Sequence, residues 1–432
     1  MSLKSQIKKI LSPEVLAKYH FVMSWLIALM FGLPAQKMIV IGVTGTKGKT
    51  STSNILWHIL NFSGNKCGLI STAQFSDGNN TWLNNLKMTM PGRFKLQKLF
   101  RQMVKNKCEY VVLETSSEGL AQSRHAGVPY RVAVFTNLTP EHIEAHGSFD
   151  NYKQAKAKLW HALVKSQSSK TLSVVNLDDE YGNYYLALPA DKKIGYTLKN
   201  KTDKQINKIY DAQIKNITEK SANFLVNGQI INLNIGGEFN VYNALAALAT
   251  ANELGISLTK IKSALEKYLG TPGRMEFIKT NKEFEVVVDY AHTQESLEQV
   301  YKTLKPQGKL IAVLGSCGGG RDKAKRPILG KLAGQYADVI FITNEDPYDE
   351  DPMSIIKSVA QGTIEAGKDQ GENLFLVFDR REAIHQALTI AKAGDIIVIT
   401  GKGSEQWLCV ANDHKLPWDD RKVVQEELLK IK

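Results

Sequence analysis

Short runs of β-branched and apolar residues alternate along most of the chain with longer segments whose apolar residues recur at helical spacing. Glycine or polar residues follow almost every apolar run directly. This alternation is typical of parallel sheets with crossover helices, which bind ligands at the carboxyl ends of their strands. The predicted strands are 38–43, 110–113, 132–135 and 173–176 in the first part of the chain, and 285–290, 310–315, 339–343 and 396–400 in the second.

The region between these two series has a different pattern and predicts a small antiparallel part. Residues 222–235 carry Asn227 and Gly228 between alternating runs, which is a signal for a type I′ hairpin. Residues 238–256 read as an alanine-rich helix, which we expect the chain to enter through Asn240. The predicted secondary structure therefore changes from strand–helix crossover units to a hairpin and a helix before the second series of strands begins.

A turn rich in glycine and proline at residues 269–276 is the best candidate for a domain boundary. The expected fold class is α/β, with a central phosphate-loop domain built on a parallel sheet and a Rossmann-like domain after it. The predicted parts are a short helical segment at 1–37, a central domain at 38–270 and a C-terminal domain at 271–432.

The N-terminal segment holds an apolar run at residues 21–33, preceded by Lys4, Lys8 and Lys9. The run is shorter than the roughly 20 residues needed to cross a bilayer, and no small-x-small cleavage site follows it. We expect a helix packed on the body of the protein. The alternative is an interfacial helix that contacts a membrane or a lipid-linked substrate.

Composition and charge narrow the function classes. The 432 residues suffice for two or three domains, and 43% apolar with 23% charged residues is ordinary for a soluble globular protein. The net charge of +12 is spread along the chain, which favours a phosphate-handling surface over a nucleic-acid partner. The four scattered cysteines form no metal-binding spacing and are expected to be reduced in a cytoplasmic protein.

Residues 40–56 combine a strand, a glycine turn and the start of a helix. The strict pattern G-x-x-x-x-G-K-[ST] fails because Val43 stands where its first glycine belongs. Backbone N–H groups at such a helix start nevertheless cradle phosphate. We expect Lys49 to reach the outer phosphates of ATP and Thr50 to offer its hydroxyl to Mg²⁺. The loop residues expected at the nucleotide are Gly45, Thr46, Lys47, Gly48, Lys49, Thr50 and Ser51.

Two further segments place polar residues after strands. Glu114 ends the predicted strand 110–113 and would face the phosphate site, where a carboxylate can hold Mg²⁺. Residues 135–160 follow another strand and bring His142, His146 and Lys156. Taken alone, the histidines could be structural, Glu114 could cap a helix, and Lys156 could be an exposed helix lysine.

In their order along the chain, these motifs resemble the Mur ligase family, which forms amide bonds in peptidoglycan precursor synthesis. The likeness rests on TGTKGKT (44–50), TNLTPEHIEAHG followed by YKQAK (136–156), GEFNVYNALAA (237–247), GRME (273–276) and DYAHT (289–293). It runs from about residue 38 to 410 and is nearest to the MurE-type enzymes, which add the third amino acid of the peptide.

The resemblance assigns roles to several residues. It implies two Mg²⁺ ions, with Thr50, Glu114, His142 and Lys156 as metal-site residues and Lys156 carbamylated by CO₂. It places Asn240 and Asn243 near the adenine, Arg274 on phosphate, and Asp289 and His292 at the nucleotide. The catalytic residues that it implies are Lys49, Glu114, His142, Lys156 and Arg274.

The resemblance also implies which group accepts the phosphate of ATP. A carboxylate of the acceptor attacks the γ-phosphate of ATP and gives an acyl phosphate, and an amine then attacks the acyl carbon and releases phosphate. Positioning and charge neutralisation supply most of the catalysis. The resemblance further implies a monomer whose two large domains close over ATP, a peptide acceptor and an amino acid.

The acceptor site departs from the MurE pattern. Thr89, Ser116, Gln122 and Arg124 match residues that hold the muramyl dipeptide. Glu118, however, stands where the family has histidine, and Met90 replaces a threonine. Only about 37 residues precede the loop, where MurE enzymes have a UDP-binding domain. A UDP-linked acceptor would therefore lose much of its usual grip, and the alternative is a lipid-linked or nucleotide-free peptide guided by the apolar helix.

The amino-acid pocket is expected at Asp346, Tyr348, Gly401 and Glu405. Diaminopimelate-adding enzymes have an arginine that pairs with the distal carboxylate of that amino acid, and this chain has Tyr348 there. An acidic pocket without arginine favours a basic amino acid such as lysine, ornithine or arginine. The acids of 349–351 either add to that negative charge or form a solvated loop.

Two other functions compete with this hypothesis. The short N-terminal segment also resembles folylpolyglutamate synthetase and the ligase half of cyanophycin synthetase, which would give the same chemistry on an acceptor outside peptidoglycan. A non-catalytic nucleotide-binding regulator is a different class of protein. The retention of Lys49, Thr50, Glu114, His142 and Lys156 argues against it.

Overall fold

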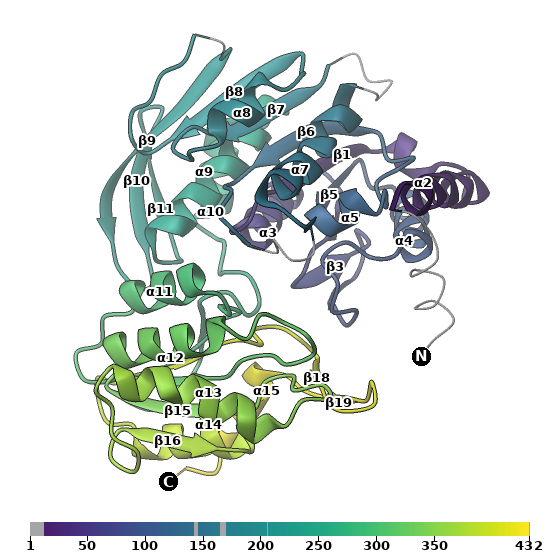
Figure 1. Cartoon of the computed structure of the whole chain (residues 1–432). Helices are drawn as coiled ribbons and strands as arrows, with labels where there is room; N and C mark the ends of the chain where they lie inside the picture. Colours follow the sequence, from purple (N-terminus) through teal and green to yellow (C-terminus); the bar gives the residue numbers. More distant parts are fainter. Residues whose placement is uncertain (1–12, 142–145, 165–169, 205, 432) are drawn as a thin grey trace. The chain divides into compact units, whose positions relative to one another are not determined.

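The computed structural model describes residues 13–141, 146–164, 170–204 and 206–431. The chain divides into two compact units (Figure 1). The first comprises the residues up to Trp82, Met88–Ile217 and Ser221–Leu269, and the second Leu83–Lys87, Thr218–Lys220 and Gly270–Lys432. The chain therefore passes into the second unit at Gly270, within the turn at 269–276 that was expected to separate two domains. The short segment 83–87 joins the second unit although it lies early in the sequence.

The first unit is built on one eleven-stranded sheet in the order β11-β10-β9-β8-β7-β6-β1-β5-β2-β3-β4. In this order, the neighbouring strands β9, β8, β7, β6, β1, β5 and β2 pair in parallel. The pairs β2–β3, β9–β10 and β10–β11 are antiparallel. The strands are β1 (Ile39–Thr44), β2 (Cys67–Ile70), β3 (Gln74–Ser76), β4 (Thr81–Leu83), β5 (Tyr110–Glu114), β6 (Tyr130–Phe135), β7 (Leu172–Asn176), β8 (Lys192–Thr197), β9 (Lys208–Ile217), β10 (Ala222–Val226) and β11 (Gln229–Leu233).

Helices cover both faces of this sheet, because successive residues of a buried strand point to opposite sides. Ile41 and Val43 of β1 belong to the hydrophobic core that includes α3, α9 and α10. Gly42 faces the other side, where a Cβ atom would lie 2.6 Å from Leu159 of α7. The helices are α2 (Pro13–Met30), α3 (Lys49–Phe62), α4 (Arg93–Lys105), α5 (Ser117–Ala121), α7 (Phe149–Val164), α8 (Gly182–Ala187), α9 (Glu238–Glu253) and α10 (Leu258–Leu265), with a 3₁₀ turn η1 (Pro34–Lys37).

The antiparallel part confirms the predicted hairpin. Val226 of β10 pairs with Gln229 of β11, so Asn227 and Gly228 form a two-residue turn, and both have positive φ angles, 47° and 76°. The prediction that helix α9 is entered through Asn240 is wrong. The helix begins at Glu238 after Gly237, whose φ of 88° turns the chain, and Asn240 lies inside the first turn.

The second unit has a six-stranded sheet in the order β12-β13-β17-β14-β15-β16. All its pairs are parallel except β12–β13, as expected for a Rossmann-like sheet with one added edge strand. The elements are β12 (Glu276–Ile278), β13 (Glu285–Val288), α11 (Gln294–Thr303), β14 (Leu310–Leu314), α12 (Lys325–Tyr336), β15 (Val339–Thr343), α13 (Pro352–Glu365), β16 (Leu374–Val377), α14 (Arg380–Ile390), β17 (Ile396–Ile399), β18 (Trp407–Cys409), β19 (Lys415–Pro417) and α15 (Asp420–Leu428).

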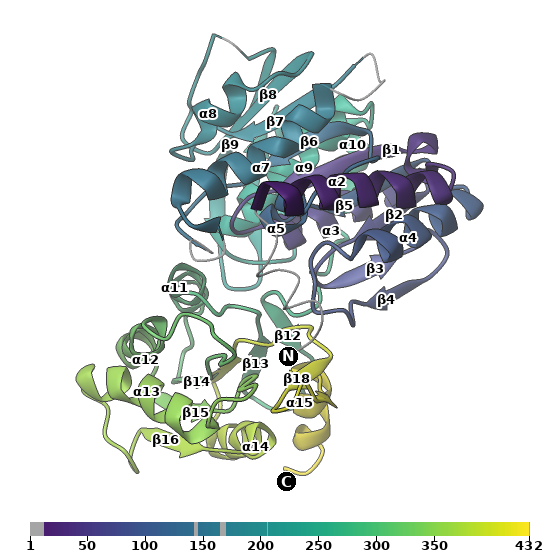
Figure 2. The ribbon, with the colours of Figure 1, turned by 45° about the vertical axis from the view of Figure 1, so that its right-hand side comes forward.

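Most of the apolar N-terminal run, residues 21–30, lies in helix α2, next to α4 (Figure 2). Across the described parts of the chain, none of the helices combines the length and the apolar character that crossing a membrane requires. The prediction of a helix here is confirmed, but many of its large side chains are exposed.

Candidate functional site

The phosphate loop connects β1 to α3 and is fixed by the segment after β6. The backbone N–H of Thr46 donates to Asn137 O at 2.8 Å, and that of Lys47 donates to Asn137 Oδ1 at 2.8 Å. The Thr136 hydroxyl donates to Lys47 O at 2.6 Å. Gly45 is required here, because a Cβ atom on it would lie 2.0 Å from Thr136 Oγ1. These hydrogen bonds hold the loop in a fixed conformation, which is the preorganisation that phosphate binding needs.

Thr50 and Glu114 meet at the ends of α3 and β5. The Thr50 hydroxyl donates to Glu114 Oε1 at 2.9 Å, and both residues are buried. Thr72 donates to the same carboxylate twice, from its N–H at 2.6 Å and its hydroxyl at 2.9 Å. The Thr72 hydroxyl lies 2.9 Å from that of Thr89, one of the expected acceptor residues. This cluster offers hydroxyl and carboxylate oxygens, the ligands that Mg²⁺ prefers.

Lys156 reaches the same loop from helix α7. Its side chain is among the most buried in the first unit, with 1% of its surface exposed, and its Nζ donates to Gly45 O at 2.7 Å. The ring of Tyr152 lies 4.3 Å from Nζ. Burial, reinforced by the nearby charge of Lys49, lowers the pKa of Lys156 well below its usual value. The alternative of an exposed helix lysine is therefore wrong.

Of the two histidines, only His146 can be placed. His142, the expected second metal ligand, lies outside the described residues. His146 shares a 3.1 Å hydrogen bond with the hydroxyl of Ser117, and burial lowers its pKa. Among the described residues, no group of three or more His, Cys, Asp and Glu side chains is arranged to hold a metal ion.

The two asparagines of α9 lie against the phosphate loop. Asn243 accepts a 3.2 Å hydrogen bond from the Thr52 hydroxyl, and a Cβ atom on Gly48 would lie 2.3 Å from its Oδ1. Asn240 accepts from Asn243 Nδ2 at 3.3 Å and donates to Gly236 O at 2.8 Å. These contacts hold the start of α9 against the phosphate loop.

The expected acceptor residues follow β5. Ser116 caps α5 by accepting from Gly119 N at 3.1 Å. Arg124 donates to Gln122 Oε1 from Nε and Nη2 at 3.1 and 2.7 Å, and to Met90 O at 2.5 Å. Burial, with the charge of Arg93 adding to it, lowers the pKa of Arg124 against the opposing effect of Glu118. Gln122 thus orients the guanidinium.

In the second unit, Arg274, Asp289 and His292 gather where β13 ends. Asp289 accepts from Met275 N and Ala291 N, each at 2.6 Å, and so ties the segment of Arg274 to the strand. Burial raises the pKa of Asp289, with Arg274 acting in the opposite direction. The guanidinium of Arg274 lies 4.2 Å above the ring of Tyr290, and His292 Nδ1 lies 2.8 Å from Tyr290 O.

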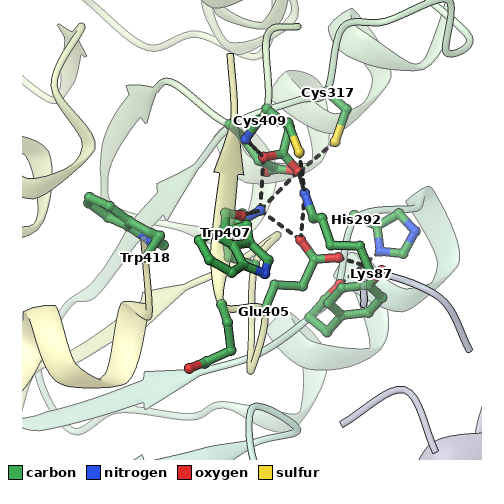
Figure 3. Close-up of polar contacts among 12 residues, drawn as sticks. Lys87, His292, Cys317, Glu405, Trp407, Cys409 and Trp418 are labelled. Carbon is green, nitrogen blue, oxygen red and sulfur yellow. Dashed lines mark hydrogen bonds and ion pairs between the residues drawn. The ribbon is translucent and has the colours of Figure 1, made fainter. Parts of the chain in front are cut away.

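Two acidic residues of the second unit, Asp346 and Glu405, form a network with two lysines; Figure 3 labels Lys87 and Glu405. Lys402, with 1% of its side chain exposed, donates to both Asp346 oxygens at 2.9 Å and to Glu405 Oε2 at 2.6 Å. Lys87 contacts Asp346 and lies 3.2 Å from Glu405 Oε2. Burial opposes the charge of Lys87, but Glu405 and Asp346 outweigh it and raise its pKa. No sequence pattern indicates that two lysines pair with these acids.

The backbone of this network is strained. Asp346 and Tyr348 have positive φ angles of 42° and 52°. Such conformations in residues other than glycine concentrate at functional sites. Gly401 has φ of 104°, and a Cβ atom on it would lie 2.0 Å from Glu345 Oε2. Burial raises the pKa of Glu345, and its Oε2 is a buried atom without a hydrogen-bond partner among the described residues.

The acids of 349–351 have structural partners. Asp351 caps α13 by accepting from Ser354 N at 3.0 Å, and Asp349 accepts from Asn412 N at 2.8 Å. Glu350 pairs with Arg326 at 3.0 Å and with Lys323 at 3.1 Å. Cations pair with Glu350, whereas Asp349 and Asp351 hold the backbone through N–H groups, so these contacts favour the interpretation of a structural acidic loop.

Comparison with known proteins decides the family. The family model of the Mur ligase middle domain matches residues 43–251, and that of the Mur ligase glutamate ligase domain matches residues 273–403. UDP-N-acetylmuramoyl-L-alanyl-D-glutamate–2,6-diaminopimelate ligase 1 of Clostridium acetobutylicum is 37% identical over 397 residues, 91% of this chain and 78% of the relative. The chain belongs to the Mur ligase family.

Further relatives agree. The UDP-N-acetylmuramyl-tripeptide synthetase of Roseiflexus sp. is 35% identical, over 94% of this Mur ligase and 81% of the relative. Among solved structures, a UDP-N-acetylmuramoyl-L-alanyl-D-glutamate–2,6-diaminopimelate ligase is 31% identical and superposes with a TM-score of 0.60, over 91% of this chain and 78% of that one. MurF from Acinetobacter baumannii, 18% identical with a TM-score of 0.64 over 95% of this chain and 80% of that one, shares the fold.

Proposed function

We propose that this Mur ligase uses ATP to activate a carboxyl group of a peptide acceptor and joins it to an amino acid whose side chain carries an ammonium group. The observation that carries the proposal is the Thr50–Glu114 hydrogen bond at the start of α3, with buried Lys156 on the neighbouring loop carbonyl. Hydrolysis of ATP alone would not need an acceptor site, yet Thr89 is linked to this cluster through Thr72. Its MurE-type relatives carry names of ligases.

The residues of the chain would handle the charge that develops on the phosphates. The loop N–H groups and Lys49 neutralise the β- and γ-phosphates while the acceptor carboxylate attacks, and Arg274 adds a second positive charge. The bond between the γ-phosphorus and the bridging oxygen breaks, and ADP leaves. The amine then attacks the acyl carbon, loses a proton and expels phosphate, which leaves the amide.

Magnesium fits the Thr50–Glu114 pair because both residues offer hard oxygen atoms beside the phosphate loop. When bound, the ion would supply positive charge to the phosphate oxygens. We propose two ions, with Thr50, Glu114, His142 and Lys156 as the residues that hold them.

We further propose that Lys156 is carbamylated. Its buried amine, with a pKa well below the usual value, favours the neutral form that can attack CO₂. The neutral nitrogen forms a bond to the carbon of CO₂ and loses one proton, so an uncharged amine becomes a carboxylate-like anion. The surrounding cations Lys47 and Lys49, which disfavour an ammonium group there, would stabilise that anion.

The acceptor proposed here is a muramyl peptide held by Thr89, Ser116, Gln122 and Arg124. Arg124 is oriented by Gln122 and suits a carboxylate of the peptide. The relatives that are named for a UDP-linked acceptor support a UDP-muramyl dipeptide, while the lipid-linked and nucleotide-free forms are the alternatives to be tested. We place the reaction in the cytoplasm, with the enzyme acting as a monomer.

The amino acid is proposed to bind at Asp346 and Glu405. An ammonium group of lysine or ornithine would take the position of Lys87, while Lys402 stays as the buried partner of both acids. Several relatives are named for diaminopimelate, which carries a distal carboxylate besides its ammonium group. Lys87 could instead donate to that carboxylate, so both amino acids belong in the test.

ADP release and the mass of the product test the proposal directly. The enzyme is given Mg-ATP, muramyl dipeptide with or without UDP, and a panel of lysine, ornithine, arginine and diaminopimelate. Release that requires both acceptor and amine, with a product heavier by one amino-acid residue, supports the ligase. ATP binding without turnover on any muramyl peptide would reject this acceptor. Folate and aspartate–arginine polymers then test the folylpolyglutamate and cyanophycin alternatives. If ADP is not released with these acceptors either, the non-catalytic nucleotide-binding regulator is favoured.

A further inference from the structure

Helix α2 shows its large apolar side chains to the outside of the first unit. Val15, Tyr19, Val22, Leu26 and Leu29 follow one another at spacings of four and three residues, so they form a single stripe. Each of them is between 48% and 55% exposed. An ordinary surface helix has the opposite arrangement, with its large apolar residues turned toward the core.

The side of α2 that faces inward has two small residues at its closest contact with the unit, with Met23 and Ile27 half-buried beside them. Ser24 and Ala28 are buried, and a Cβ atom on Gly127 would lie 2.7 Å from that of Ala28. The helix is therefore closely packed on the unit at Ser24 and Ala28, and its apolar stripe cannot turn inward without losing that contact. A contiguous exposed apolar stripe on a packed helix indicates an interaction surface.

Helix α4 lies beside α2 and brings positive charge (Figure 2). Phe31, just after α2, packs edge-on against Phe94 with ring centroids 5.0 Å apart, and Arg93 Nη2 lies 2.6 Å from His20 Nδ1. The sequence of α4 contains no acidic residue. Its basic residues are Arg93, Lys95, Lys98, Arg101 and Lys105, and the last four are exposed.

A groove of about 1060 Å³ lies between α4, the end of α2 and the turn that follows α2. Apolar residues from both helices line it, and cations surround them, without any acidic residue in the lining. The apolar lining includes Leu29, Met30, Phe31 and Phe94, and the cations are Lys37, Lys98, Arg101 and Lys105.

We propose that this α2–α4 surface binds the surface of an anionic phospholipid bilayer. The apolar stripe, which includes Tyr19, would enter the boundary between headgroups and acyl chains together with the exposed Trp25. The cations of α4 would meet lipid phosphates. A second copy of the chain fits less well, because a symmetric contact through this face would set the cations of α4 against each other.

The proposal goes beyond the ligase reaction and does not depend on it, because none of these residues belongs to the phosphate loop or to the proposed substrate sites. Its consequence is a ligase held at a membrane surface, where a lipid-linked acceptor would be concentrated.

Flotation of the full-length protein with vesicles tests the proposal. Vesicles of phosphatidylcholine alone are compared with vesicles that also contain phosphatidylglycerol, at low and at high salt. We expect binding to the anionic vesicles, weakening with salt because the attraction is screened. Equal binding to both vesicles, or binding to neither, would overturn the proposal.

Two triple variants locate the surface. Lys98→Glu/Arg101→Glu/Lys105→Glu should weaken binding by about 100-fold or more, given the usual effect of single basic residues at anionic membranes. Its matched control, Lys260→Glu/Lys279→Glu/Lys357→Glu, changes the charge equally at exposed lysines elsewhere. Val22→Ser/Leu26→Ser/Leu29→Ser should also lose binding, whereas Ile230→Ser/Ile364→Ser/Ile390→Ser should not.

The oligomeric state of the same variants separates a bilayer from a protein partner. Sedimentation should give the same mass for the wild type and both surface variants, with unchanged thermal melting. A wild-type dimer that the α2 variant dissociates would show that a second copy covers the face, and would overturn the proposal. If the α2 variant fails to fold, the α4 variant, whose changes are all exposed, still decides the outcome.

Discussion

The hydroxyl of Thr50 donates a 2.9 Å hydrogen bond to the carboxylate of Glu114, although the two residues are 64 positions apart in the sequence. The bond joins the first turn of α3 to the end of β5, and Thr72 holds the same carboxylate from a third segment. Strand β5 pairs directly with β1, which leads into the phosphate loop. The sheet therefore sets the position of Glu114 relative to the loop.

The first prediction concerns this pair. Glu114→Gln should lower kcat/KM for acceptor-dependent ADP release by about 100-fold, a loss typical of groups that support a metal site. Thr50→Ser keeps the hydroxyl and should keep most of the activity, while Thr50→Val should lose it. Because the two groups act together, the double variant Thr50→Val/Glu114→Gln should have a kcat/KM only slightly lower than that of Glu114→Gln. Additive losses, measured in steady-state kinetics, would show that the two act separately.

The sequence predicted the fold because its strands are short, buried on both faces and followed by glycine or polar residues. All eight predicted strands are strands, and the predicted hairpin turns at Asn227 and Gly228. The phosphate loop and Glu114 could be predicted for the same reason, since they lie at the carboxyl ends of neighbouring strands.

Long-range polar partners could not be predicted from the sequence. Lys87 and Asp346 are 259 positions apart, and nothing in the local pattern around Lys87 indicates an acidic partner. The orientation of α2 was also not predictable. Its apolar residues occur all round the helix, so the packing of α2 on the unit, which buries Ser24 and Ala28, determines which of them remain outside.

The second prediction uses the lowered pKa of Lys156. In CO₂-free buffer, the unfolded chain binds a proton at this lysine up to its ordinary pKa of about 10.4, whereas the folded chain releases it at a much lower pH. Between the two pKa values, the free energy of unfolding should rise with pH, by up to ~1.4 kcal/mol per pH unit. Chemical denaturation at several pH values should show this rise in the wild type, and Lys156→Met should reduce it. Lys158→Met, at an exposed neighbouring position, should leave it unchanged.

The third prediction compares two glycines with similar backbone angles. Gly401 and Gly371 have φ of 104° and 93°, but only Gly401 has an atom, Glu345 Oε2, in the place of a Cβ. Gly371→Ala should destabilise the protein by about 1 kcal/mol through backbone strain alone. Gly401→Ala should cost about 1–3 kcal/mol more, because it must displace a buried carboxyl. Equal melting temperatures for the two variants would contradict the contact with Glu345.

The fourth prediction concerns Lys402, which lies between Asp346 and Glu405 with almost no exposure. Lys402→Met should destabilise the protein by about 3–5 kcal/mol, because removal of one partner leaves a buried charge without its main counterion. Lys392→Met, at an exposed lysine, should change stability by less than about 0.5 kcal/mol. Adding Asp346→Asn to Lys402→Met should recover part of the loss in denaturant titrations. No recovery would mean that the lysine acts through packing rather than charge.

The fifth prediction distinguishes the two amino acids through Lys87. Its ammonium group contacts Asp346 and Glu405, the two acids that are proposed to receive the substrate, and 12% of its side chain is exposed, more than that of Lys402. If lysine or ornithine displaces Lys87, then Lys87→Met removes a competitor.

The KM for these amino acids should then fall by about tenfold, which corresponds to ~1.4 kcal/mol of avoided displacement. Lys87→Arg, which keeps the charge, should show no such fall. If instead Lys87 binds the distal carboxylate of diaminopimelate, Lys87→Met should raise the KM for diaminopimelate by a similar factor, while the KM for lysine stays constant. An unchanged KM for every amino acid would exclude Lys87 from the pocket. Because Lys402 remains to neutralise the acids, the Lys87→Met variant should fold, so that kinetics on the full panel can decide among the three outcomes.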